Sequence, residues 1–187
     1  APELIKDSGS YSVWFKPPGM LAQGTEWGDH CSLLRVSELA FDKPRQSFLV
    51  QRLDREAFGL MIIAHQQKAA AQLSTLFQQR KIEKHYEIEV DGDVQWQKLT
   101  VNSPLDGKHA VSHFAKRTYD ADKNRTTLDV SIETGRMHQI RRHCASIGHP
   151  VSGDSRYGRK SQDGLQLKAS RLQFDCPITH KKQIFSC

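Results

Sequence analysis

The spacing of apolar and polar residues divides the first half of the chain into strands and one helix. Three mainly apolar runs have the length of strands, and the third predicts a buried strand. These runs cover residues 12–16, 47–53 and 60–64. From residue 66 to about residue 79, apolar residues recur at helical spacing, which predicts an amphipathic helix. Its apolar side comprises Ala69, Ala70, Leu73, Leu76 and Phe77.

The pattern in the second half of the chain predicts further strands and one more helix. Residues 85–90 alternate along a strand that places Tyr86, Ile88 and Val90 on one face. Further strands are predicted at 111–119, 126–133 and around 172–174. A helix over 137–147 would end before Gly148 and bury a stripe formed by Met137, Ile140, Cys144 and Ile147. This order lacks a regular βαβ rhythm, so it favours an α+β fold with a mixed, mainly antiparallel sheet flanked by helices.

Length and hydropathy bound the class of protein. A chain of 187 residues predicts one domain over residues 1–187. No apolar run approaches the roughly 20 residues that span a bilayer, and the start has no secretory pattern. We therefore expect a cytoplasmic protein without a membrane partner, and a monomer with no protein partner implied. The first residue is Ala1 rather than Met, which leaves open whether native terminal residues are missing.

The charge of the chain and its cysteines indicate which ligands and which thiol state to expect. Lys and Arg number 27 against 21 Asp and Glu, a net charge of +6 that favours a polyanion through phosphate contacts. The four cysteines form no C-x-x-C pair, so we expect reduced thiols rather than a disulfide framework. The histidines and cysteines lack the close pairs of a zinc module, and no metal site is expected.

Two segments carry candidate chemistry. In Val50–Leu60 (VQRLDREAFGL), Asp54 lies in a charged loop between two strands, where functional residues often sit. A salt-bridged turn is the alternative interpretation of R-L-D-R. In Thr134–Gly158 (TGRMHQIRRHCASIGHPVSGDSRYG), arginines and histidines precede a Gly-rich loop. This pattern predicts a site for an anion or a carboxylate, with a solvated basic helix face as the alternative.

Together with KPPGM (16–20) and KHYEIEV (84–90), these segments resemble in order and spacing the RluA-type pseudouridine synthases. TGRMHQIR and GHPVSGDSRYG match that family nearly completely, and LQLKASRLQFDCPIT resembles its closing strand, so the resemblance covers residues 11 to about 185. Ala57-Phe58 replaces the usual Thr-Ser, Gln51 a common His, and Lys168 a usual His. The resemblance implies the pseudouridine synthase catalytic fold, here without the N-terminal S4 module of many relatives.

The resemblance also implies the reaction. The family isomerises uridine in tRNA, large-subunit ribosomal RNA or both, by breaking the N1 glycosidic bond and reattaching uracil through C5. It uses no cofactor and no metal. By similarity, Asp54 is the catalytic carboxylate and Arg141 its cationic partner, while Tyr86 stacks on the uracil. Whether the carboxylate attacks the base or assists departure at the sugar stays open.

The substrate contacts follow from the same resemblance. Arg52 matches a residue that enters the space left by the flipped base, and Ile140 one that packs against the base, with a core role as its alternative. Arg136 and His138 are the other expected substrate-binding residues. Two rival classes remain: a non-catalytic RNA-binding relative, and a hydrolase that pairs Asp54 with Glu56 or Asp154.

Overall fold

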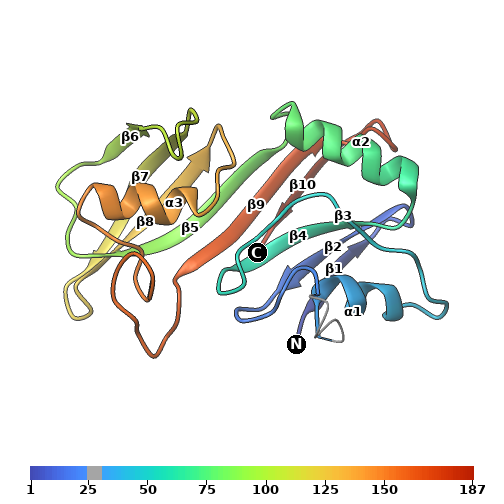
Figure 1. The fold of residues 1–187 in the computed structure, drawn as a ribbon, viewed down its shortest axis with the longest axis horizontal. Helices are drawn as coiled ribbons and strands as arrows, with labels where there is room; N and C mark the ends of the chain where they lie inside the picture. Colours follow the sequence, from blue (N-terminus) through green and yellow to red (C-terminus); the bar gives the residue numbers. More distant parts are fainter. Residues whose placement is uncertain (25–30) are drawn as a thin grey trace. The chain divides into compact units, whose positions relative to one another are not determined.

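A computed structural model describes residues 1–24 and 31–187 of the chain (Figure 1). These residues divide into two compact units. Unit 1 comprises residues 1–83 and 169–187, and unit 2 comprises residues 84–168. The predicted α+β class is confirmed, because antiparallel strand pairs dominate and three helices accompany them within the described residues.

Unit 1 is built on antiparallel strands with one helix on each side of β4. Its elements are β1 (Glu3–Asp7), β2 (Tyr11–Lys16), α1 (Leu33–Leu39), β3 (Phe48–Leu49), β4 (Phe58–Ala64), α2 (Gln67–Gln78), most of β9 (Leu167–Asp175) and β10 (Lys182–Ser186). The strands follow the order β1-β2-β4-β9, while β3 pairs with β4 and β10 with β9. The strand pairs β1–β2, β2–β4, β3–β4 and β9–β10 are antiparallel.

The apolar run of β4 has partners on both faces. Leu60 and Ile62 belong to the core cluster that also holds Leu73 of α2. Met61 and Ile63 belong to a second cluster with Leu33 of α1. Because successive side chains of a strand point to opposite faces, a strand covered on both sides needs a continuous apolar sequence. The predicted buried strand is therefore confirmed.

The helix predicted from residue 66 to about residue 79 is confirmed as α2. Ala69 and Leu73 are buried, and the other predicted apolar residues pack against the same cluster. The strand predicted over 47–53 was too long, because β3 contains only Phe48–Leu49 before the chain turns into the Asp54 loop. The pattern also gave no prediction of α1, whose Ser32 side chain caps the helix by accepting the Arg35 N–H at 3.2 Å.

Unit 2 is a four-stranded antiparallel sheet in the order β5-β8-β7-β6. Its elements are most of β5 (Glu83–Asp91), β6 (Lys98–Asn102), β7 (Val111–Asp120), β8 (Arg125–Ile132) and α3 (Gln139–Ser146). Helix α3 lies against β7, as Figure 1 shows. The buried apolar residues include Ile88, Phe114 and Leu128 of the sheet and Ile140 and Cys144 of α3.

The helix predicted over 137–147 starts later than expected. His138 adopts the left-handed conformation (φ 52°, ψ 32°), which a right-handed helix cannot include, so α3 begins at Gln139. As a consequence, Met137 leaves the predicted apolar stripe and is 52% exposed, so its assignment to the core was wrong. Arg141, outside the stripe, is only 5% exposed. In the described part of the chain no helix is long and apolar enough to cross a bilayer.

Candidate active site

Asp54 lies in unit 1, half-buried in the loop that joins β3 to β4. The loop closes on itself, since the Ala57 N–H donates to the Asp54 carbonyl at 3.2 Å. Ala57 has no exposed surface, and the Phe58 ring lies 6.3 Å from that of Phe15. The two residues that depart from the Thr-Ser of the family pattern therefore pack beneath the loop.

The KPPG segment fixes the Asp54 loop through the backbone of Arg55. The Arg55 carbonyl accepts hydrogen bonds from Lys16 Nζ at 3.0 Å and from the Gly19 N–H at 2.9 Å. In return, Arg55 Nε donates to the Gly19 carbonyl at 3.0 Å. Hydrogen bonds donated in both directions thus join the turn after β2 to the loop before β4.

Lys16 itself is fully buried and donates to two further carbonyls, those of Pro17 (3.1 Å) and Met20 (2.8 Å). Burial lowers the pKa of Lys16 to about 8, although the carboxylates of Glu56 and Asp54 oppose that shift. A buried ammonium surrounded by carbonyl oxygens therefore lies at the base of the loop that carries Asp54.

Gly59 ends the loop where only glycine fits. Its φ is +113°, and a Cβ at this position would lie 2.3 Å from the Ala169 carbonyl oxygen of β9. The close approach of these two strands sets where the Asp54 loop returns to the sheet. At the other end of the loop, Arg52 is exposed and has no ion pair with the described residues, which leaves its guanidinium accessible to a ligand.

In unit 2, Arg141 forms a buried ion pair with Asp154. Arg141 Nε and Nη2 each donate to one carboxylate oxygen of Asp154, both at 2.8 Å. The carboxylate also accepts the backbone N–H groups of Arg156 (3.0 Å) and Tyr157 (3.1 Å). Burial alone would raise the pKa of Asp154, but the Arg141 fork and the two backbone donors outweigh it and lower that pKa.

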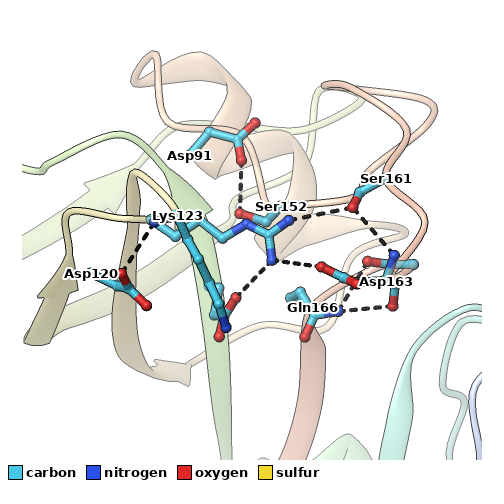
Figure 2. Close-up of polar contacts among 10 residues, drawn as sticks. Asp91, Asp120, Lys123, Ser152, Ser161, Asp163 and Gln166 are labelled. Carbon is cyan, nitrogen blue, oxygen red and sulfur yellow. Dashed lines mark hydrogen bonds and ion pairs between the residues drawn. The ribbon is translucent and has the colours of Figure 1, made fainter.

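The segments before and after Asp154 are held by hydrogen bonds and ion pairs at several points (Figure 2). Ser152 Oγ donates to Asp91 at 2.8 Å, and Arg125 Nη1 bridges Glu89 and Asp163 at 3.2 Å each. Gly153 approaches the Gly164 carbonyl so closely that a Cβ would lie 1.9 Å from it. The loop that carries Asp154 is therefore held at both of its ends.

A buried amide organises the segment before α3. Gln139 Oε1 accepts the Thr134 hydroxyl (2.6 Å) and the Arg136 N–H (3.1 Å). Gln139 Nε2 donates to the Val111 carbonyl (2.9 Å) and to Ser112 Oγ (3.0 Å) on β7. All four hydrogen-bonding positions of this amide are used, so Gln139 links the loop before α3 to strand β7.

The other predicted residues of unit 2 gather around this helix. His138 Nδ1 lies 2.9 Å from the Tyr157 hydroxyl, and the Arg141 guanidinium lies 5.3 Å from the Tyr157 ring centroid. Ile140 is 5% exposed, so most of its side chain packs inside the unit. Tyr86 is half-buried on β5, opposite Val130 of β8.

Five of the seven predicted site residues thus belong to unit 2, and Arg52 and Asp54 belong to unit 1. Sequence reasoning did not find Asp154 as the partner of Arg141, nor Tyr157 between His138 and Arg141. Both lie in the GDSRYG segment, whose resemblance to the family was the available signal. The described residues contain no group of three or more His, Cys, Asp or Glu placed to hold a metal ion.

The sequence matches the family described as RNA pseudouridylate synthase over residues 10–146. It is 33% identical over 207 residues to "Uncharacterized RNA pseudouridine synthase YhcT" of Bacillus subtilis, covering 96% of this chain and 68% of that protein. It is 29% identical over 201 residues to "Ribosomal large subunit pseudouridine synthase C" of Vibrio cholerae, covering 96% and 63%. Other curated relatives are covered over as little as 40% of their length.

Solved structures share the fold. "Human RNA Pseudouridylate Synthase Domain Containing 1" superposes with a TM-score of 0.84 at 19% identity, over 100% of this chain and 83% of that one. The corresponding human protein "Domain Containing 4" gives 0.77 at 19% identity, over 99% and 87%. The fold is that of the pseudouridine synthases, as predicted. The chain belongs to the RNA pseudouridylate synthase family, and its relatives place it among the RluA-type members.

Proposed function

We propose that this protein isomerises specific uridines in RNA to pseudouridine, with Asp54 as the catalytic carboxylate and Tyr86 and Arg141 as further catalytic residues. The observation that carries the proposal is the family match over residues 10–146, a range that includes all three residues. Residues 1–187 would act as one catalytic domain, in a cytoplasmic monomer that needs no cofactor. The reaction would break the N1 glycosidic bond of uridine and rejoin the base through C5.

The chemistry requires an accessible base and an ionised carboxylate. A uridine in structured RNA must be flipped out at a cost of a few kcal/mol. Arg52, exposed beside the Asp54 loop, is suited to stack and hydrogen-bond in the vacated space. Within unit 2, the half-buried Tyr86 offers a ring for stacking, while Ile140, Arg136 and His138 would complete the substrate contacts.

The hydrolase alternative is weakened by the surroundings of Asp154. A glycosidase needs a second carboxyl group that can donate or accept a proton. Asp154 is fully buried, its pKa is lowered, and its oxygens accept four hydrogen bonds from Arg141 and two backbone N–H groups. A carboxylate held in this way stays ionised and serves to position Arg141.

The test is tritium release from RNA labelled with 5-tritiated uridine. The Asp54→Asn variant keeps the shape of the side chain and removes its charge, so it should fold normally and release no tritium above background. Asp42→Asn provides a matched control, since Asp42 is an exposed carboxylate of the same unit. Full turnover by Asp54→Asn would reject Asp54 as the catalytic residue, and free uracil from the wild-type protein would support a hydrolase.

The RNA target is a finer question. Several relatives are named as synthases of the large ribosomal subunit, which favours ribosomal RNA over tRNA as the target. Pseudouridine mapping in total RNA, with and without the protein, would identify the position. RNA binding without any base conversion would instead support the non-catalytic alternative.

A further inference from the structure

The connection between β6 and β7 is a short hairpin whose tip is exposed. Leu105 and Lys108 exchange backbone hydrogen bonds of 2.9 and 3.0 Å across the turn. The central residues Asp106 and Gly107 have φ values of 53° and 72°, as a type I′ hairpin turn requires. The turn therefore has a defined geometry, and it presents Lys108 and His109 to solvent.

Three side chains from the segment 136–143 hold this hairpin. Arg142 donates two hydrogen bonds to the carboxylate of Asp106, at 2.9 and 3.0 Å. Arg136 Nε donates to the His109 carbonyl at 2.9 Å, and His143 Nε2 donates to the Ser103 carbonyl at 2.9 Å. The residues that precede and form α3 thus fix both sides and the tip of one loop.

The charge at this surface is positive. The negative charge of Asp106 is matched by Arg142, which also lowers the pKa of Asp106. Lys108 has no ion pair with the described residues, and Arg136 uses only its Nε in the contact with His109. Two cations therefore face solvent from a rigid support, an arrangement that favours the phosphates of a nucleic acid.

We propose that the hairpin 103–110 is an RNA-docking element in which Lys108 contacts the phosphate backbone and the Asp106–Arg142 pair is the clamp that positions it. The proposal rests on the proposed function, since it takes RNA as the partner. It adds the hairpin and Lys108 to the expected substrate contacts, of which Arg136 lies beside the hairpin. The contact is to phosphate, so it contributes affinity without reading sequence.

The first experiment measures binding of a fluorescein-labelled RNA stem-loop over a range of salt concentrations. One lost phosphate contact should reduce the slope of log K against log salt by about one and raise Kd roughly fivefold at low salt. We expect this for Lys108→Ala, with recovery in Lys108→Arg. In multiple-turnover assays KM should rise while kcat is unchanged, because the contact is equal in ground and transition states.

Lys123→Ala is the matched control. Lys123 is an exposed lysine in the turn at the far end of β7, where its N–H donates to Asp120 at 3.1 Å (Figure 2). The ten residues of β7 place the two turns about 30 Å apart. The control removes the same charge from the same unit and should leave the slope unaltered. Equal effects of Lys108→Ala and Lys123→Ala would overturn the proposal.

The clamp has a test in which two interpretations predict opposite signs. Asp106→Asn removes a negative charge, so general electrostatics predicts tighter RNA binding. If the ion pair positions Lys108, binding should weaken, and Lys108→Ala should have a smaller effect in the Asp106→Asn background. Tighter binding would overturn the clamp. The wild-type protein could release no tritium and still show the expected salt slopes. That result would reject the proposed function but support the docking surface.

Discussion

Lys16 offers the sharpest test of how this fold holds its Asp54 loop. The perturbation is Lys16→Met, which keeps the length and apolar stem of the side chain and removes its ammonium group. Lys6→Met is the control, because Lys6 is an exposed lysine on the neighbouring strand β1. Lys16 has no exposed surface, whereas lysine is among the residues least often buried without a partner.

Two opposing contributions set the expected change in the free energy of unfolding. The fall in pKa from 10.5 to about 8 means that burial disfavours the charged form by about 3 kcal/mol. Against this, Lys16 Nζ donates to three carbonyls, and each bond from a charged donor contributes about 1.5–3 kcal/mol. Lys16→Met removes the burial cost together with these bonds, and it leaves the Pro17 and Met20 carbonyls without this donor. We expect Lys16→Met to lower the free energy of unfolding by about 3 kcal/mol, or the melting temperature by about 8 °C.

The pH dependence gives an independent check. Between pH 8 and 10.5 the unfolded chain keeps the proton on Lys16 while the folded protein loses it. The unfolded state then binds more protons, so the stability of the wild type should rise with pH across this range, by up to about 3 kcal/mol. Lys16→Met lacks this contribution, and all other titrating groups are shared by the two proteins. The stability gap between them should therefore widen above pH 8.

Urea unfolding followed by circular dichroism, repeated from pH 7 to pH 10, measures both quantities. A loss below 1 kcal/mol at pH 7, or a loss matched by Lys6→Met, would refute the anchoring of the loop by Lys16. A gap that stays constant between pH 8 and pH 10 would refute the lowered pKa. The tritium assay on the same variant reports whether a loosened loop also slows the reaction.

Three further predictions concern the arginines and their partner. Arg141→Lys should lower kcat/KM by at least tenfold, because an ammonium cannot form the two parallel bonds to Asp154; unchanged kinetics would reject the fork. Asp154→Asn should lower the free energy of unfolding by about 3 kcal/mol near pH 7, since it removes one charge of the buried Arg141–Asp154 ion pair. Because the pKa of Asp154 is lowered by folding, this difference should be complete above about pH 4 and disappear as pH falls through the folded pKa, which acid titration of both proteins would show. Arg52→Ala should melt like the wild type and lose roughly tenfold in kcat/KM; normal activity would remove Arg52 from base flipping.

The spacing of apolar residues predicted the buried helix and strand well and the exposed or short elements poorly. The apolar run of β4 and the helical spacing of α2 both reflect burial, and both elements lie where the pattern placed them. Strand β1 is exposed at every residue, so no alternation of burial could mark it in the sequence. Helix α1 has only seven residues, too few to establish a period. Elements with little burial leave little signal.

The site shows the same limit at the level of single residues. The helical spacing placed Arg141 outside the apolar stripe, yet Arg141 is buried and pairs with Asp154, thirteen residues further on and beyond an irregular loop. No periodic spacing connects such a pair. Lys168, which departs from the family pattern, lies 3.3 Å from Glu87, and only coordinates reveal this ion pair. The family resemblance named Arg141 as a site residue, but it gave neither of these two ion pairs.

Neighbouring arginines of α3 perform two separate structural tasks, and this explains why the segment from Thr134 to His143 carries so many polar residues. Arg141 points into the unit and holds the loop of Asp154, whereas Arg142 points to the surface and holds the hairpin of Asp106. Both use the two-pronged geometry that lysine lacks. One eight-residue helix, anchored to β7 by Gln139, therefore fixes two loops that are far apart in sequence. A disturbance of this helix would displace both loops at once.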